Sequence, residues 1–131
     1  MKNNYNWQEY TILIAEDERI SLNYLRALLK KTKVNVIHSN DGVATFVECL
    51  KNEKIDLVLM DIKMLGINGL EATKLIKKYR PSIPIIAQTA YAQVGDCERC
   101  LLFGCDDYVA KPFLANEILE KIDRLLKKVE K

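Results

Sequence analysis

Acidic, hydroxyl and lysine side chains stand at the ends of four short apolar runs in this sequence. They are Glu16, Asp17 and Glu18 after residues 11–15, Asp61 after residues 55–60, Thr89 at the end of residues 84–89, and Lys111 after residues 107–110. If these runs are neighbouring strands of one sheet, their ends bring the carboxylates, the hydroxyl and the ammonium group to a single edge. Such a set can hold a cation and a negatively charged group.

The three acids Glu16, Asp17 and Asp61 would repel one another if their strands are adjacent. Two like charges about 4 Å apart repel by roughly 4 kcal/mol at an effective dielectric constant near 20, so a cation must offset them. A site built only of oxygen donors favours a hard cation, and Mg²⁺ prefers one or two carboxylates, retained water and phosphate oxygens. The acids therefore predict Mg²⁺ together with a phosphoryl group.

A simpler reading of each residue stays open when it is taken alone. Asp17 or Glu18 could cap the N-terminus of the helix that follows, because acids are favoured there. Thr89 could be an ordinary turn residue and Lys111 a surface lysine. The common placement of all of them at strand ends is what favours the site.

The elements that must position these residues alternate along the chain. Nearly continuous apolar runs at residues 11–15 and 55–60 are typical of strands buried on both faces of a parallel sheet, and residues 34–37, 84–89 and 107–110 are similar. Helical spacing of apolar residues lies between and after them, at residues 20–29, 41–50, 70–79, 96–103 and 118–129. This alternation predicts a doubly wound α/β fold, a parallel sheet with helices on both faces.

The composition indicates one domain. The chain has 131 residues, 49% of them hydrophobic, enough for one core and too few for two ordinary domains. Residues 1–10 are interpreted as an N-terminal tail or linker remnant, and residues 11–131 as the domain. A net charge of +2 without a basic block does not favour nucleic acid as a partner. Without an apolar segment suited to export or to spanning a membrane, a cytoplasmic location is expected.

The four cysteines are expected to be reduced thiols rather than a disulfide framework. Cys97 and Cys100 form a CxxC motif, but no second such motif accompanies it, and the single histidine, His38, lies far away in sequence. A zinc or redox site is therefore not favoured. We expect two thiols on a helix, one of them facing inward.

Four segments in order resemble the response-regulator receiver family of two-component signalling. They are ILIAEDE at residues 12–18, DLVLMDIKM at 56–64, PIIAQTA at 84–90 and DDYVAKPF at 106–113. The Glu16–Asp17 pair and PIIAQTAYA are most similar to receivers of hybrid sensor histidine kinases. The resemblance implies that residues 11–131 form a receiver domain with a flavodoxin-like sheet of five strands in the order 2-1-3-4-5.

The resemblance also implies roles for the site residues. Asp61 matches the phosphoryl acceptor, Asp17 the direct Mg²⁺ ligand, and Glu16 an acid that acts on the metal mainly through water. The backbone carbonyl of Lys63 is the expected fourth contributor. Glu16 departs from the family's more common aspartate.

Further matches concern the response to phosphorylation. Thr89 and Lys111 match the hydroxyl and the lysine that contact the phosphoryl group, and Tyr108 matches the switch aromatic residue. Pro112 stands where the family commonly has a cis peptide bond. Lys63 and Tyr91 match the family positions that flank the path of the attacking water, so slow self-dephosphorylation is expected. The alternative is that both side chains simply face solvent. Leu65 replaces the family's usual proline, and its loop is expected to be less rigid.

The implied function is transfer of a phosphoryl group from a partner's phosphohistidine to Asp61. The donor would be a histidine kinase or a histidine phosphotransfer domain. The output would be a changed surface of the fourth helix, fifth strand and fifth helix, binding a downstream protein or a second copy of the chain, without nucleic-acid or membrane contact. The domain would not be a conventional turnover enzyme.

Three other classes share some of these features. A haloacid-dehalogenase-like phosphatase needs a second acid where Lys63 stands, and a flavodoxin needs a hydroxyl- and glycine-rich loop where residues 16–21 are acidic. A receiver-like binding module that is never phosphorylated remains an alternative, against which the complete set of acceptor, metal, hydroxyl and lysine residues argues.

Overall fold

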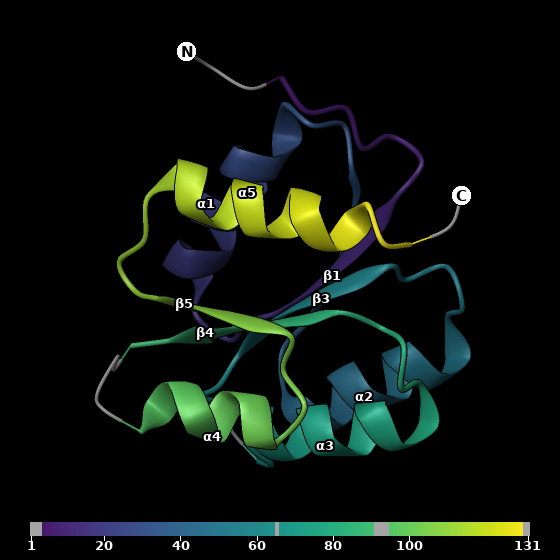
Figure 1. The fold of residues 1–131 in the computed structure, drawn as a ribbon, viewed down its shortest axis with the longest axis vertical. Coiled ribbons are helices and arrows are strands. Elements are labelled where there is room, and N and C mark those ends of the chain that lie inside the picture. Colours follow the sequence, from purple (N-terminus) through teal and green to yellow (C-terminus); the bar gives the residue numbers. More distant parts are fainter. Residues whose placement is uncertain (1–3, 65, 91–94, 130–131) are drawn as a thin grey trace.

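The computed structural model describes residues 4–64, 66–90 and 95–129, and it shows one parallel sheet flanked by helices (Figure 1). Strands and helices alternate along the chain. They are β1 (Thr11–Ala15), α1 (Arg19–Lys30), β2 (Asn35–Ser39), α2 (Gly42–Lys51), β3 (Leu57–Asp61), α3 (Gly69–Tyr79), β4 (Ile85–Thr89), α4 (Asp96–Leu102), β5 (Asp107–Ala110) and α5 (Ala115–Leu126).

The sheet has the order β2-β1-β3-β4-β5, with every neighbouring pair parallel. The doubly wound α/β fold and the strand order 2-1-3-4-5 are therefore confirmed. The order reverses between β1 and β3, where Ala15 lies opposite Met60. At such a reversal the crossovers leave in opposite directions, which opens a crevice above the carboxyl ends of the two strands.

Two hydrophobic cores lie on opposite faces of the sheet. Helices α1 and α5 cover one face, and α2, α3 and α4 cover the other (Figure 1). Successive side chains of a strand point to opposite faces, so Ile12 and Ile14 pack under α1 and α5 whereas Leu13 and Ala15 pack against the other layer. Because both faces are buried, the strands need the near-continuous apolar runs that the sequence shows.

The element boundaries differ from the expected ones by a few residues. Strand β3 begins at Leu57, and the side chain of Asp56 just before it accepts a hydrogen bond of 2.9 Å from the backbone N–H of Thr11. Strand β3 also includes Asp61, so this residue ends the strand rather than following it. Helix α5 ends at Leu126, before the last residues of the predicted stripe. None of the described helices is both long and apolar enough to cross a membrane.

The residues before β1 pack on the domain from residue 5 onward. Trp7 is buried in the core under α1 and α5, its ring stacks on that of Tyr5 at 5.0 Å, and its indole N–H donates to Asp123. The backbone N–H of Trp7 donates to the carbonyl of Thr32 at 2.7 Å. The assignment of residues 1–10 as a tail or linker remnant stays a prediction. The structure adds that Trp7 of this segment belongs to the core.

Three cysteines are buried free thiols. Cys49 and Cys105 lie in the core between the sheet and α2–α4, as does Cys100, the inward-facing cysteine of α4. Burial raises the pKa of the Cys49 thiol to about 12, and a hydrogen bond with Cys100 together with burial raises the pKa of Cys105. These thiols are therefore poor nucleophiles. The side chain of Cys97 lies outside the described part.

In the described part of the chain, a buried amide of the sheet has no hydrogen-bond partner. Gln88 of β4 is fully buried, and among the residues that the structure describes none bonds to its amide oxygen or nitrogen. A buried amide left without hydrogen bonds costs about 1–3 kcal/mol relative to a paired one. The residue thus lowers the stability of an otherwise apolar strand.

Replacing Gln88 by methionine tests this cost. Methionine has a similar length and no polar group that needs a partner, so we expect Gln88→Met to raise the free energy of unfolding by about 1–3 kcal/mol. Chemical denaturation followed by circular dichroism measures the change. A variant less stable than the parent would contradict the absence of a partner for the amide.

Candidate functional site

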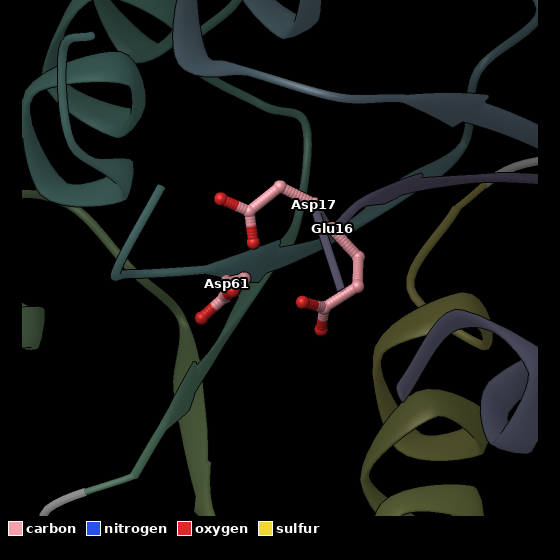
Figure 2. A group of neighbouring side chains, drawn as sticks. All are labelled: Glu16, Asp17 and Asp61. Atoms are coloured by element: carbon pink, nitrogen blue, oxygen red, sulfur yellow. The ribbon is translucent and has the colours of Figure 1, made fainter. Parts of the chain in front are cut away.

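The carboxylates of Glu16, Asp17 and Asp61 gather at the carboxyl ends of β1 and β3. Ligand oxygens of the three side chains lie within 4.8 Å of one another, and Figure 2 shows the side chains around a common space. The β1–β3 pairing brings them together, because Ala15 pairs with Met60 and the acids follow directly on both strands. The predicted convergence is therefore present.

Burial and charge are unequal across the cluster. Glu16 is 1% exposed and Asp61 6%, whereas Asp17 is exposed. The ammonium of Lys111 lies 3.0 Å from a carboxylate oxygen of Glu16 and 3.8 Å from one of Asp61. Three carboxylates beside one ammonium leave a formal excess of two negative charges, which matches a divalent cation.

The pKa of Asp61 is raised by its buried and negatively charged surroundings. Burial raises the pKa to about 7, with a hydrogen bond to Glu16 and the repulsion from its charge acting in the same direction. Lys111 and the hydrogen bond from the backbone N–H of Lys63 lower it, but less. Without a cation, full ionisation of the cluster is therefore unfavourable near neutral pH.

Backbone groups of the loops fix the two buried carboxylates. The N–H of Lys63 donates to Asp61 at 3.2 Å, and the N–H of Glu18 donates to Glu16 at 3.3 Å. Glu18 occupies the N-cap position of α1, but its side chain makes no cap hydrogen bond and instead accepts from the hydroxyl of Ser21. The structure therefore does not support the alternative that the side chain of Glu18 caps α1.

Thr89 and Lys111 come from the neighbouring strands. Thr89 ends β4, is 7% exposed, and its carbonyl accepts from the backbone N–H of Lys111 at 2.7 Å. The Lys111–Pro112 peptide bond is cis, as the resemblance implied. The side chain of Lys111 extends across the strand ends to Glu16, so a residue that follows β5 reaches one that follows β1.

The remaining predicted residues lie around the cluster. Tyr108 is half-buried on β5, with the ammonium of Lys121 5.1 Å from the centre of its ring. Lys63 is exposed. Tyr91 and Leu65 lie outside the described residues. A cavity of about 320 Å³ opens beside the site on the α3 and α4 side, with Lys63, Thr89 and Arg99 in its wall.

Two residues that sequence reasoning did not select also shape the site. A Cβ atom at Gly69 would lie 2.3 Å from the carbonyl oxygen of Asp61, so α3 can start against the end of β3 only with glycine there. The ring of His38 lies 2.7 Å from the carbonyl oxygen of Glu16 and pins the turn after β1. The Asn68–Gly69 pair is a turn signal that could have indicated the role of Gly69. No local sequence pattern indicates the contact of His38.

Comparison with known proteins agrees with this geometry. The family model for the response regulator receiver domain matches residues 12–123. The hybrid signal transduction histidine kinase G of Dictyostelium discoideum is 36% identical over 125 residues, which are 89% of this chain and 4% of that protein. The polar-differentiation response regulator DivK of Brucella anthropi is 32% identical over 118 residues, which are 88% of this chain and 95% of that protein.

A solved structure is similar over nearly the whole domain. It is the receiver domain of sensor histidine kinase PA1611 from Pseudomonas aeruginosa PAO1, whose structure has a magnesium ion coordinated in the active-site cleft. The two chains are 32% identical with a TM-score of 0.83, over 90% of this chain and 98% of the other. Receiver domains are signalling domains. With the matched segment spanning most of the sequence, the chain belongs to the response regulator receiver domain family.

Proposed function

We propose that this chain takes a phosphoryl group from a partner's phosphohistidine onto Asp61 in the presence of Mg²⁺. The observation that carries the proposal is the cluster of Glu16, Asp17 and Asp61 with the ammonium of Lys111 3.0 Å from Glu16. This arrangement joins a buried carboxylate nucleophile, an oxygen-rich cation site and a lysine able to contact a phosphoryl oxygen.

The donor set fits Mg²⁺. Carboxylates from Asp17 and Asp61 and the carbonyl of Lys63 would bind the ion directly, and Glu16 would act mainly through water. When bound, Mg²⁺ neutralises charge on the phosphoryl oxygens and on the cluster. The excess of two negative charges around Asp61 supports the proposal, as does the magnesium ion in the similar receiver structure.

The transfer is an in-line displacement at phosphorus. A carboxylate oxygen of Asp61 forms the new P–O bond while the P–N bond to the donor's imidazole breaks, and the bonding electron pair returns to that nitrogen. Lys111 exchanges its contact with the carboxylate of Glu16 for one with a phosphoryl oxygen. The product is an acyl phosphate on Asp61.

The donor is a histidine kinase or a histidine phosphotransfer domain. The chain's own histidine, His38, lies in β2 with its ring bound to the Glu16 carbonyl, a position that supports its exclusion as donor. Water later attacks phosphorus and breaks the P–O bond to Asp61, releasing inorganic phosphate. In this proposal the domain acts as a signalling partner of its donor rather than as an enzyme with conventional turnover.

Phosphorylation would change the surface formed by α4, β5 and α5. The phosphoryl group adds roughly two negative charges and new acceptor oxygens, toward which the hydroxyl of Thr89 moves. Tyr108 then turns inward, and the cavity behind Thr89 supports this step because it leaves room on that side of β4. Leu101 and Leu102 of α4 are 53% and 82% exposed, an apolar area suited to a downstream protein or a second copy of the chain.

The chain covers only a small part of one relative and nearly all of another. Its resemblance to hybrid-kinase receivers supports a place in a multistep phosphorelay. The stimulus and the output are then set by whichever polypeptide carries or contacts the domain.

Changing the acceptor tests the central proposal. We expect Asp61→Asn to abolish labelling by a small phosphodonor such as acetyl phosphate in Mg²⁺, because an amide is a poor nucleophile and removes one charge from the metal site. Intact-mass spectrometry detects the gain of one phosphoryl group. Asp56→Asn is a control, since Asp56 lies at the opposite end of β3. Labelling of Asp61→Asn at the parent's rate would assign the acceptor elsewhere.

Lys111→Ala should separate metal binding from switching. Loss of a cation 3.8 Å from Asp61 removes repulsion toward Mg²⁺, so we expect the Mg²⁺ affinity to stay unchanged or rise by up to about tenfold. Binding of a downstream partner after phosphorylation should be impaired. Calorimetric Mg²⁺ titration of both proteins measures the first effect, and a markedly weaker affinity in the variant would refute this role for Lys111.

The lifetime of the acyl phosphate is proposed to depend on Tyr91 and Lys63. A tyrosine ring over the phosphoryl group would obstruct in-line water, and the lysine ammonium would hold a phosphoryl oxygen. We therefore expect the acyl phosphate to decay faster in Tyr91→Ala than in the parent. Decay in Mg²⁺ is followed by intact mass, with Tyr79→Ala, an exposed tyrosine of α3, as the control. Equal rates for Tyr91→Ala and the parent would show that Tyr91 does not gate water.

A further inference from the structure

A groove of about 720 Å³ lies between α3 and α4, on the face of the sheet opposite to α1 and α5 (Figure 1). One wall includes Leu70, Lys74 and Lys78 of α3, which are four residues apart and therefore share one face of the helix. The helix rises about 12 Å from the first of them to the last, so this wall is about two turns long. Arg99 of α4 and Phe103 directly after that helix stand in the other wall.

Apolar side chains form part of this α3–α4 groove. Leu70 is buried, Phe103 is half-buried, and Leu75 of α3 is 37% exposed. A concave surface that combines exposed apolar area with a charged rim is typical of a protein-interaction site. A partner that covers Leu75 and the accessible part of Phe103 gains about 25 cal/mol for each Å² of apolar surface removed from water.

The charges of the groove are mostly positive and uncompensated. Within the described part of the chain, no carboxylate forms an ion pair with any of its three cations, which are Lys74, Lys78 and Arg99. The neighbouring Lys77 differs, because its ammonium pairs with Asp106 at 2.8 Å. Glu71 is the acid in the groove wall. Three cations and one acid leave a formal excess of two positive charges, which favours an acidic partner.

The placement of the cations favours a helix over a small anion. Lys74 and Lys78 stand one turn apart on α3, whereas Arg99 stands on α4, so the cations flank the apolar side chains from both walls. An amphipathic helix with acids on both sides of an apolar stripe matches this order, because its stripe enters the groove while its acids face the two walls. A nucleic acid would leave the apolar side chains uncovered, and Glu71 would repel its phosphates.

We propose that the α3–α4 groove docks an acidic amphipathic helix of a partner protein. The apolar stripe of that helix packs on Leu75 and Phe103, and its acids pair with the three cations. The groove is separate from the exposed apolar area of Leu101 and Leu102, which are not part of its walls. Docking does not require the phosphoryl group, so the proposal is tested on the unphosphorylated protein.

Fluorescence anisotropy of a labelled synthetic helix measures the docking. The probe is a fluorescein-labelled peptide of about three turns, with leucine at every third or fourth position and glutamate on both flanks of the leucine stripe. Two control peptides isolate its features: one replaces glutamate by lysine, and the other replaces leucine by serine. We expect saturable binding of the probe to the full chain, weaker binding of the serine peptide and no binding of the lysine peptide.

Three variants locate the binding in the groove. Lys74→Gln with Lys78→Gln should weaken the probe's affinity by about fivefold or more, since each lysine forms an exposed ion pair with a glutamate. The matched control is Arg26→Gln with Lys30→Gln, two exposed cations with the same spacing on α1, and it should leave the affinity unchanged. Glu71→Gln should raise the affinity, because it removes the acid from the groove. Circular dichroism verifies that each variant is folded.

The results that would overturn the proposal are distinct. Absence of saturable binding would show that the groove does not accept such a helix. Equal loss of affinity in the α1 control, or weaker binding by Glu71→Gln, would show that the peptide responds to overall charge or binds elsewhere. Equal binding of the serine peptide would exclude a role for the apolar side chains. Tighter binding of a fluorescein-labelled oligothymidylate than of the probe would assign the groove to nucleic acid instead.

Discussion

Mutual repulsion among the carboxylates at the ends of β1 and β3 is the constraint on which the site depends. Glu16 and Asp61 are buried almost completely and still lie side by side. Burial and neighbouring charge raise the pKa of Asp61 to about 7, so without a cation this carboxyl group is partly protonated near neutral pH. Lys111 offsets the charge of only one of the three carboxylates, so the cluster is suited to an added cation.

The fold supplies the means to hold this unfavourable group in place. Adjacent parallel strands β1 and β3 set the spacing of the acids, and backbone N–H groups of the following loops orient their oxygens. Gly69 lets α3 begin directly against the carbonyl of Asp61. The stability needed to offset the repulsion comes from the two apolar cores, which bury both faces of the sheet.

Polar residues in an otherwise apolar sheet are concentrated at its carboxyl-end margin. Glu16 follows β1, Asp61 ends β3 and Gln88 is the residue before the end of β4, and the side chain of Lys111, which follows β5, reaches Glu16. Buried polar groups cost stability wherever they lack partners. Their placement at one margin confines that cost to the crevice and leaves the middle of each strand apolar.

The sequence alone determined the alternation of strands and helices, the parallel sheet and the gathering of Asp61 with Glu16 and Asp17, because apolar runs and the residues at their ends are local patterns. Tertiary structure alone decided that Trp7 is buried, that His38 binds the Glu16 carbonyl and that Gln88 has no hydrogen-bond partner among the described residues. Each of these depends on which distant residue comes to lie alongside. The Trp7 indole meets Asp123 from the other end of the chain. Sequence periodicity does not predict such a long-range contact, because it depends on how the helices pack on the assembled sheet.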